Sequence, residues 1–242
     1  MDLTERQKEI LLAVINEFME EACEVGSLSL LEKYDLGVSS ATIRNEMVKL
    51  MQLGLLEKSH ISSGRFPTDQ ALRLYVSKFI DDNGLNPLVS VEIRQEIFRE
   101  RFSKETVIKA ILRIMAKETS TLAFMVLDED VRSYGLSNLL KCEEFVDNVE
   151  RTRTVVNILE DDTFLRDLVE QYSGSGVSLL IGGESGIDNL ANCALAFVNV
   201  PFWDERKTYV GVIGTKRMEY SKVLSALKEV KSALEKSMLG WR

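Results

Sequence analysis

The chain has 242 residues, of which 45% are hydrophobic and 28% charged. These proportions are ordinary for a globular protein with a sizeable core. No uninterrupted apolar run is long enough to cross a membrane, and the first ten residues are too polar for a secretory signal. The three cysteines, Cys23, Cys142 and Cys193, lie far apart and fit buried thiols in a reducing compartment better than disulfides or a metal site. We therefore expect a cytoplasmic protein with no membrane partner.

The net charge of −8 would argue against nucleic acid as a partner if it were spread evenly along the chain. Residues 1–38 carry three Lys or Arg against nine Asp or Glu, whereas residues 39–80 carry six against three. The first segment therefore has a balance of −6 and the second of +3. Binding of nucleic acid follows the local field and not the total charge. The segment 39–80 is the candidate surface for an anionic partner.

A first helix is predicted from Thr4, because Thr4 and Gln7 have the spacing of a capping box, in which each side chain satisfies the other's backbone N–H. We expect this helix to form the floor of a small N-terminal domain. Its acidic end, Glu17 to Glu24, should point away from DNA. The apolar positions at helical spacing are Ile10, Leu11, Val14, Ile15 and Phe18.

Two short helices joined by a glycine-containing turn are predicted between Val25 and Gly54, and that order is the signature of a helix-turn-helix. Ser39 is placed to cap the second helix, because a Ser hydroxyl accepts a hydrogen bond from an N–H of the first turn. Gly54 ends it, because glycine tolerates the left-handed conformation just past a helix. Ser27 is expected to cap the first helix, and residues 35–37 form the turn. The residues expected to face inward are Leu28, Leu31 and Tyr34 in the first helix, and Ile43, Met47 and Leu50 in the second.

The outer face of the second helix carries side chains that can read DNA bases. An arginine such as Arg44 can pair with guanine through two hydrogen bonds, and an asparagine such as Asn45 can do the same with adenine. Thr42 and Lys49 fall on the same polar side, where Lys49 is expected to contact phosphate. A polar helix face alone is more typical of an ordinary solvated helix. The order of helix, glycine turn, polar-faced helix and hairpin favours DNA.

A β-hairpin wing is predicted directly after the second helix. Residues 55–59 can form a strand, residues 62–64 can turn it, and the chain returns before Pro67 stops the pairing. Gly64, at the tip, would allow close approach of the backbone, and a basic side chain beside it could enter the minor groove. The candidate DNA-contacting residues are therefore Ser39, Ser40, Thr42, Arg44, Asn45, Lys49, His60, Ser63, Gly64 and Arg65.

The segment 81–87 is rich in turn residues and marks a domain boundary. We predict a winged helix-turn-helix domain at residues 1–80, a linker at 81–87 and a second domain at 88–242. The second domain contains both helix-like and strand-like runs, which predicts an α+β fold with a mostly antiparallel sheet. Helices are expected at 91–102, 104–118, across 143–172 and at 219–238, and strands at 121–127, 131–135, 177–181, 194–200 and 208–213.

The sequence shows no catalytic or metal-binding constellation, so neither an enzyme nor a cofactor is expected. His60 is the only histidine, which leaves no histidine cluster for a metal. The glycine-rich stretch 182–186 lacks the lysine of a P-loop and the spacing of a dinucleotide motif, so we interpret it as a tight turn. The alternative to a DNA-binding protein is a ligand-binding or protein-interaction module whose winged helix does not read DNA. The two differ in whether duplex binding depends on Arg44.

Three groups of residues form a pattern that generic helix or strand requirements do not explain. The first is Leu3–Ile10, Val25–Ser27 and Ser39–Met47; the second is His60–Asp69 and Arg73–Val76; the third is Gly135–Leu140, Glu144–Phe145, Ile181–Glu184 and Gly211–Tyr220. In these residues the chain resembles the HrcA-type heat-inducible transcription repressors of bacteria. The resemblance implies an N-terminal winged helix and a GAF-like domain, with a dimerising domain inserted in the latter.

The resemblance also implies a dimer that binds an inverted-repeat operator upstream of chaperone genes, and a chaperonin that keeps the repressor active. The sequence departs from the family pattern at Ser40, where the family usually has proline at the first helical position. It is also short, since only residues 128–134 separate the strand at 121–127 from Gly135, where the family carries its inserted domain. We expect that domain to be absent, and a homodimer formed through the GAF-like domain, with Phe202 and Trp203 as an aromatic anchor.

Overall fold

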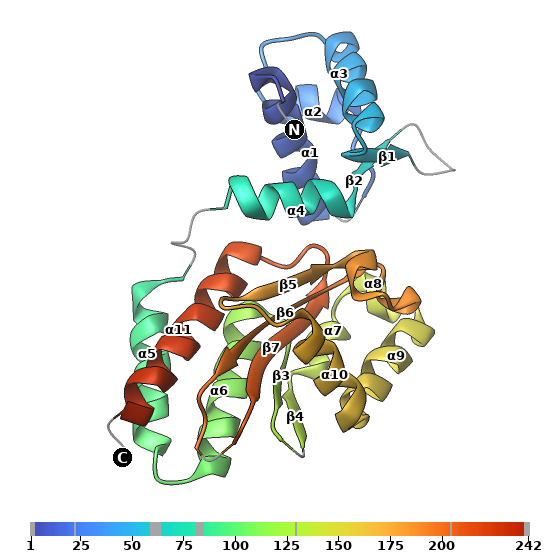
Figure 1. Ribbon diagram of the computed structural model, residues 1–242. Helices are drawn as coiled ribbons and strands as arrows, with labels where there is room; N and C mark the ends of the chain where they lie inside the picture. Colours follow the sequence, from blue (N-terminus) through green and yellow to red (C-terminus); the bar gives the residue numbers. More distant parts are fainter. Residues whose placement is uncertain are drawn as a thin grey trace. The chain divides into compact units, whose positions relative to one another are not determined.

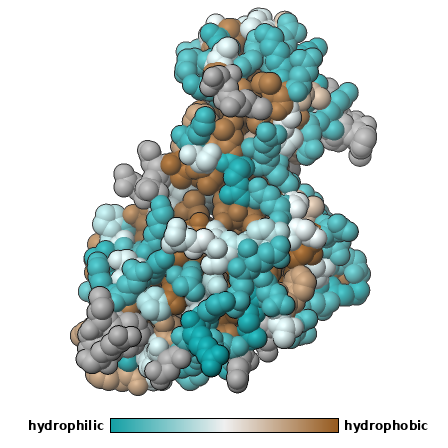
Figure 2. Space-filling model, viewed as in Figure 1, coloured by the Kyte–Doolittle hydropathy of each residue, from teal (hydrophilic) through white to brown (hydrophobic). Residues whose placement is uncertain are grey.

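The computed structural model divides into two compact units, Met1–Ile80 and Asp81–Arg242, each described here by itself (Figure 1). Hydrophilic side chains cover most of the face seen in Figure 2, and apolar side chains form separate patches on it. No helix among the described residues has the length and apolar character needed to span a bilayer. The described residues are 3–21, 23–58, 64–80, 85–128, 130–203 and 205–239, without the side chains of Asp162, Met238 and Leu239.

The N-terminal unit begins with three helices, continues through a small antiparallel sheet and ends in a fourth helix. The predicted capping box is confirmed, because the Gln7 N–H donates to Thr4 Oγ1 at 3.2 Å and the Thr4 N–H donates to Gln7 Oε1 at 3.1 Å. Thr68 starts the last helix in the same manner, since its Oγ1 accepts from the Ala71 N–H at 3.2 Å. The elements are α1 Glu5–Glu21, α2 Ser27–Lys33, α3 Ser40–Gln52, β1 Leu56–Lys58, β2 Arg65–Pro67 and α4 Asp69–Lys78.

The expected inner face of α2 is wrong by one residue. Leu28 and Leu31 are exposed, while Leu30 is fully buried and Ser27 nearly so. Ser27 therefore does not cap the helix: it is the first helical residue, and Gly26 takes the cap position without a side-chain hydrogen bond. The rest of the expected core is confirmed, apart from Phe18 of α1 and Tyr34, the residue after α2, which are only half-buried. Its buried members are Ile10, Leu11, Val14 and Ile15 of α1 and Ile43, Met47 and Leu50 of α3.

The C-terminal unit is built on a five-stranded antiparallel sheet in the order β4-β3-β7-β6-β5. Helices α6 and α11 pack against one face of it, and α9 and α10 against the other (Figure 1). The predicted α+β class with an antiparallel sheet is thus confirmed. The strands are β3 Leu122–Val126, β4 Val131–Tyr134, β5 Ser178–Ile181, β6 Cys193–Val200 and β7 Thr208–Thr215; the long helices are α5 Pro87–Glu100, α6 Lys104–Thr119, α9 Val149–Glu160, α10 Asp162–Tyr172 and α11 Tyr220–Leu239.

The helix α5 starts earlier than expected. It begins at Pro87, and Asn86 caps it by accepting from the Leu88 N–H at 2.9 Å. Proline suits the first helical position, because its missing N–H would have no partner there in any case. The helix thus includes the last residue of the expected linker, while residues 81–84 of that linker lie outside the described part of the chain. Helix α5 contacts α6 and α11 and forms the outermost layer of the unit on that side (Figure 1).

Several of the motif residues in this unit have structural roles. A Cβ on Gly211 of β7 would overlap the ring of Phe124 and lie 2.7 Å from the carbonyl oxygen of Ala196, so only glycine fits between β3 and β6. Asn138 donates from Nδ2 to the carbonyl oxygens of Ala116 and Thr121, both at 2.9 Å, and so joins the end of α6 to the start of β3. It lies in a short helix that was not expected, α7 Leu136–Leu139.

An ion pair joins two other motif segments. Arg217 Nε donates to Glu144 Oε1 at 2.7 Å and Nη2 to Glu144 Oε2 at 3.3 Å, which ties the segment after β7 to the short helix α8, Glu143–Val146. Burial alone would raise the pKa of Glu144, but the hydrogen bond and charge of Arg217 outweigh it and leave that pKa lowered. Phe202 is also internal, at 1% exposure, so its expected role as an aromatic anchor for a second copy is wrong.

Candidate nucleic-acid interface

The helix α3 is held in place at its start and through α1. Ser39 Oγ accepts from the Thr42 N–H at 3.2 Å, as predicted for the capping residue, and lies 3.0 Å from Thr42 Oγ1. Gln7 of α1 donates from Nε2 to Glu46 Oε2 at 3.2 Å. The turn before the helix is fixed as well, since Arg6 Nη1 donates to the Leu36 carbonyl oxygen at 2.9 Å. The rotation of α3 about its axis is therefore set by its buried apolar residues and by the hydrogen bonds of Ser39, Gln7 and Arg6.

With that rotation fixed, the predicted base-reading side chains face outward. Arg44, Asn45 and Lys49 are exposed, and Thr42 and Ser40 are half-buried near the helix start. Lys49 does not extend freely, because its Nζ lies 2.7 Å from Glu46 Oε1 one turn earlier. The hydrogen bond from Lys49 is the main cause that lowers the pKa of Glu46. An exposed pair of this kind is weak, so phosphate could compete for the lysine.

Three basic residues surround a groove beside α3. Arg44 of α3, Lys58 of β1 and Arg65 of β2 line a hollow of about 310 Å³. Lys58 and Arg65 are direct partners in the β1–β2 ladder, which brings their Cα atoms opposite each other. The remaining lining residues are Gly26, Ser27, Leu28 and Met47. The fold therefore concentrates positive charge at a concave surface next to the outward face of α3.

The hairpin is tied back to the body of the unit. The Val25 N–H donates to the Arg65 carbonyl oxygen and the Arg65 N–H to the Val25 carbonyl oxygen, both at 3.0 Å. This pairing explains why residue 64 is a glycine. Gly64 is buried, and a Cβ there would overlap the side chain of Glu24. The expectation that Gly64 lies at the hairpin tip is therefore wrong. Its small size is needed for packing against the strand-like segment that precedes α2.

The structure brings together some of the predicted residues and adds one. Arg44 and Arg65 line the same groove, whereas Asn45 and Lys49 lie on the outward face of α3 beyond it. His60 and Ser63 lie outside the described residues. Lys58 was not predicted as a site residue. The sequence feature that could have identified Lys58 is its position in the short strand that pairs with the segment around Arg65.

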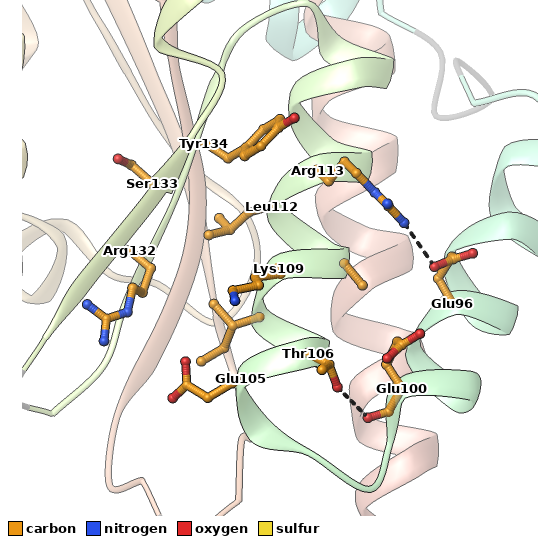
Figure 3. Close-up of a pocket in the computed structure, with 12 residues that line it drawn as sticks. Glu96, Glu100, Glu105, Thr106, Lys109, Leu112, Arg113, Arg132, Ser133 and Tyr134 are labelled. Atoms are coloured by element: carbon orange, nitrogen blue, oxygen red, sulfur yellow. Dashed lines mark hydrogen bonds and ion pairs between the residues drawn. The ribbon is translucent and has the colours of Figure 1, made fainter.

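The C-terminal unit has a hollow of about 500 Å³ between α5, α6 and β4 (Figure 3). Charged groups at its edge are engaged with each other: Arg113 Nη2 lies 3.2 Å from Glu96 Oε2. Thr106 Oγ1 donates to the Glu100 carbonyl oxygen at 3.1 Å. Nothing in this set resembles a catalytic pair, and the described residues hold no group of three or more potential metal ligands. We therefore interpret the hollow as a surface groove and not as an active site.

Comparison with known proteins decides the family. The family model described as "HrcA protein C terminal domain" matches residues 40–224. The chain belongs to the HrcA family. Among curated HrcA relatives, the "Heat-inducible transcription repressor HrcA" of Clostridium botulinum (strain Alaska E43 / Type E3) is 25% identical, over 95% of this chain and 96% of the relative. The protein of the same name from Pelotomaculum thermopropionicum is 26% identical, over 99% of each chain.

The alignments also bear on length and class. The alignment with the C. botulinum HrcA spans 334 positions, more than the 242 residues of this chain, so part of that relative has no counterpart here. The relatives are named as transcription repressors, which are regulatory proteins and not enzymes. A solved structure titled "Crystal structure of a hypothetical protein at 2.2 A resolution" superposes with a TM-score of 0.78 over 99% of both chains, at 19% identity. That likeness shows that the fold is shared.

Proposed function

We propose that this HrcA-family chain is a sequence-specific, DNA-binding transcriptional repressor. The observation that carries the proposal is the placement of Arg44: it lies on the exposed face of α3 and also lines the basic groove with Lys58 and Arg65. A single helix thus presents base-reading side chains beside groups that can hold the phosphate backbone. Specific recognition needs both kinds of contact, because phosphate contacts position a protein and base contacts specify the sequence.

In this proposal residues 1–80 are a winged helix-turn-helix domain. Helices α2 and α3 are its helix-turn-helix, β1 and β2 are its wing, and α3 enters the major groove with its first two turns. Arg44 and Asn45 read base edges there. Ser39, Ser40 and Thr42, at the start of α3, lie near the DNA sugar-phosphate backbone. Lys49, Lys58 and Arg65 bind phosphates. The relatives' printed name, heat-inducible transcription repressor, supports this assignment and suggests genes of the heat-shock response as targets.

The second part of the proposal concerns assembly. Residues 87–242, from the start of α5, form a GAF-like domain, joined through a linker that ends at Asn86. Two copies of the chain bind an inverted-repeat operator, since a two-fold site calls for a two-fold protein. We infer that the family's inserted dimerising domain is missing here. The short connection between β3 and β4, in which the Leu127 N–H donates to the Asp130 carbonyl oxygen at 2.8 Å, supports this inference. A cytoplasmic chaperonin is the proposed regulator, as the family resemblance implies.

The test is equilibrium binding of the full chain to duplex DNA taken from upstream of its own gene and of the host's chaperone genes. Wild-type protein should bind one such duplex with an inverted repeat at least about 1,000-fold more tightly than random duplex. Arg44→Ala should lose about 1–3 kcal/mol on that operator, because a two-pronged base contact is removed. Arg153→Ala, which removes an exposed arginine from α9, is the matched control and should bind as the wild type does.

Two results would reject the proposal. Equal affinity of the wild type for all duplexes would leave a protein-interaction or ligand-binding module as the better account. Equal binding of operator by Arg44→Ala and wild type would show that α3 does not read bases, whatever the affinity.

A further inference from the structure

The outward side of α5 carries an apolar stripe that no described element of the C-terminal unit covers. Ile93 and Ile97 point into the unit and are buried, at about 1% exposure. On the opposite side Leu88, Val91 and Phe98 are 76%, 44% and 59% exposed, and Phe102, two residues past the helix end, is 84% exposed. Isolated exposed apolar residues are common, but an aligned set with two aromatic rings marks an interaction surface.

The spacing of this stripe is that of a helix-pairing seam. Positions 88, 91, 95 and 98 of α5 alternate intervals of three and four residues, which is the a/d pattern of a coiled coil, and Phe102 continues that spacing in the turn just past the helix end. Gln95 is the single polar member. A helix whose inner side is buried in its own unit and whose outer side repeats the a/d pattern is suited to pack against another helix.

The charges beside the stripe select the occupant and its direction. If a second α5 packs antiparallel, one register places Val91 against the other copy's position 102, and Gln95 against its position 98. In that register Glu92 of each copy lies beside Arg99 of the other. Two attractive pairs then form when these side chains exchange their partners within the chain, Lys117 for Glu92 and Glu96 and Glu100 for Arg99. In the alternative register one heptad away, Glu92 of one copy faces Glu92 of the other copy, and the two like charges repel each other. Of these two registers, the first is therefore the one with complementary charges.

On the other side of the stripe the same register brings two arginines near each other, and their repulsion is reduced by contacts within each chain. There Arg94 of one copy approaches Arg101 of the other. Arg94 is already neutralised, because its Nε and Nη2 donate to the two carboxylate oxygens of Glu229 at 2.6 and 3.1 Å. The Arg101 guanidinium lies over the rings of Phe98 and Phe102, at 3.8 and 4.1 Å from their centroids.

A groove next to the stripe offers space for a partner's side chain. The hollow has a volume of about 510 Å³ and runs between α5 and α11. Its lining includes Phe98 and the buried Ala233, with Arg94, Arg101 and Lys236 as basic residues. An aromatic ring from a facing α5 fits such a site, because its face attracts cations while its body fills apolar space.

We propose that the α5 surface, defined as Leu88, Val91, Gln95, Phe98 and Phe102, is where two copies of this chain associate, with their α5 helices antiparallel. The partner is a second copy of the chain itself. This inference names the contact for the homodimer in the proposed function, and in that respect rests on it. It also explains how a chain that lacks the family's inserted dimerising domain can still supply a two-fold pair of DNA-binding units.

Sedimentation of the full chain over a micromolar concentration series tests the surface. The wild type should sediment as a dimer of the 27.4 kDa chain, and Phe98→Asp should weaken association about 30-fold or more, as loss of a central aromatic anchor does. Val149→Asp is the matched control. Val149 is 68% exposed at the first position of α9, where an aspartate favours the helix, so this variant should dimerise normally.

A charge exchange tests the register. Glu92→Arg and Arg99→Glu should each weaken association about fivefold, and the two together should restore it to within about twofold of the wild type. Both single variants break ion pairs within the chain, Glu92 with Lys117 and Arg99 with Glu96 and Glu100, so helix content is compared by circular dichroism. A wild-type monomer, or an undiminished Phe98→Asp dimer, would overturn the inference. Failure of the double variant to recover would overturn the antiparallel register.

The two proposals can fail separately. Binding of a half-site duplex requires one DNA-binding unit only, so Phe98→Asp should keep half-site affinity while losing about 30-fold or more on the full inverted repeat. A wild-type dimer that binds no DNA would reject the repressor function and keep the α5 contact. A wild-type monomer that binds half-sites would do the reverse.

Discussion

The two units use their most distinctive residues in opposite ways. In the N-terminal unit, Arg44 and Asn45 are exposed on the outward face of α3. In the C-terminal unit, Gly211 and Asn138 lie where a change would disturb the sheet or the corner between α6 and β3. The same kind of sequence motif therefore marks exposed side chains in one unit and packing in the other. Exposure, and not the motif itself, separates the two.

The largest expected effect on this comparison comes from Gly211→Ala. The added Cβ would overlap Phe124 and lie 2.7 Å from the Ala196 carbonyl oxygen, in the middle of the sheet. Overpacking of this kind should lower the free energy of unfolding by about 3 kcal/mol, measured by urea denaturation. Gly176→Ala is the control, since nothing lies within 4 Å of its Cβ position. A stable Gly211→Ala protein with altered DNA binding would reverse the assignment of this motif to packing.

A smaller effect is expected from Arg217→Met, which removes the partner of Glu144. The pair is about one-fifth exposed on each side, so its loss should cost about 1–2 kcal/mol at neutral pH. The folded-state pKa of Glu144 is lowered, so the contribution of the pair is present above the ordinary glutamate pKa of about 4.5 and is lost as the pH falls. The difference in unfolding free energy between wild type and variant should therefore shrink towards pH 3.

The pH series contains its own check. If the stability difference between Arg217→Met and the wild type is the same at acid and neutral pH, the ion pair is not its cause. DNA binding at neutral pH should be unchanged as long as the variant is folded.

The smallest expected effect is on DNA affinity and comes from Lys58→Ala in the N-terminal unit. Lys58→Ala removes one basic side chain from the groove lined by Arg44 and Arg65. It should weaken binding to operator and random duplex alike and reduce the slope of log affinity against log salt by about one, as loss of one phosphate contact does. A change in base preference would instead make Lys58 a reading residue. Lys8→Ala on α1, also basic and partly exposed, provides the comparison.

The sequence predicted best those features that depend on neighbouring residues. The limits of α3 follow from the Ser39 cap and from Gly54, whose φ of +73° is the left-handed conformation that glycine favours. The strands of the second unit were predicted to within one or two residues at each end. Strands β3, β5, β6 and β7 are largely apolar runs, whereas the exposed β4 is marked by the turn residues Asp130 and Gly135 on its two sides. The family resemblance was confirmed by the match over residues 40–224.

Features that depend on distant contacts were missed. The seven-residue helix α2 has too few apolar positions to fix its rotation, so its inner face was predicted one residue out of phase. Gly64 was misplaced because its burial comes from the pairing of Val25 with Arg65, forty positions along the chain. Pro87 was interpreted as part of a linker, although it occupies the first position of a helix. Lys58 lies in a three-residue strand, which has no periodicity to mark its side. The DNA contacts themselves stay predictions.

Selection of binding sites from a random duplex library by the full chain tests whether α3 reads DNA bases. We expect enrichment of an inverted repeat, because two copies present two α3 helices related by a two-fold axis. Selection with Arg44→Ala should return the same repeat with relaxed preference at one symmetric position in each half-site. An unenriched library, or an identical motif from wild type and Arg44→Ala, would contradict the assignment of α3 as the DNA-reading helix.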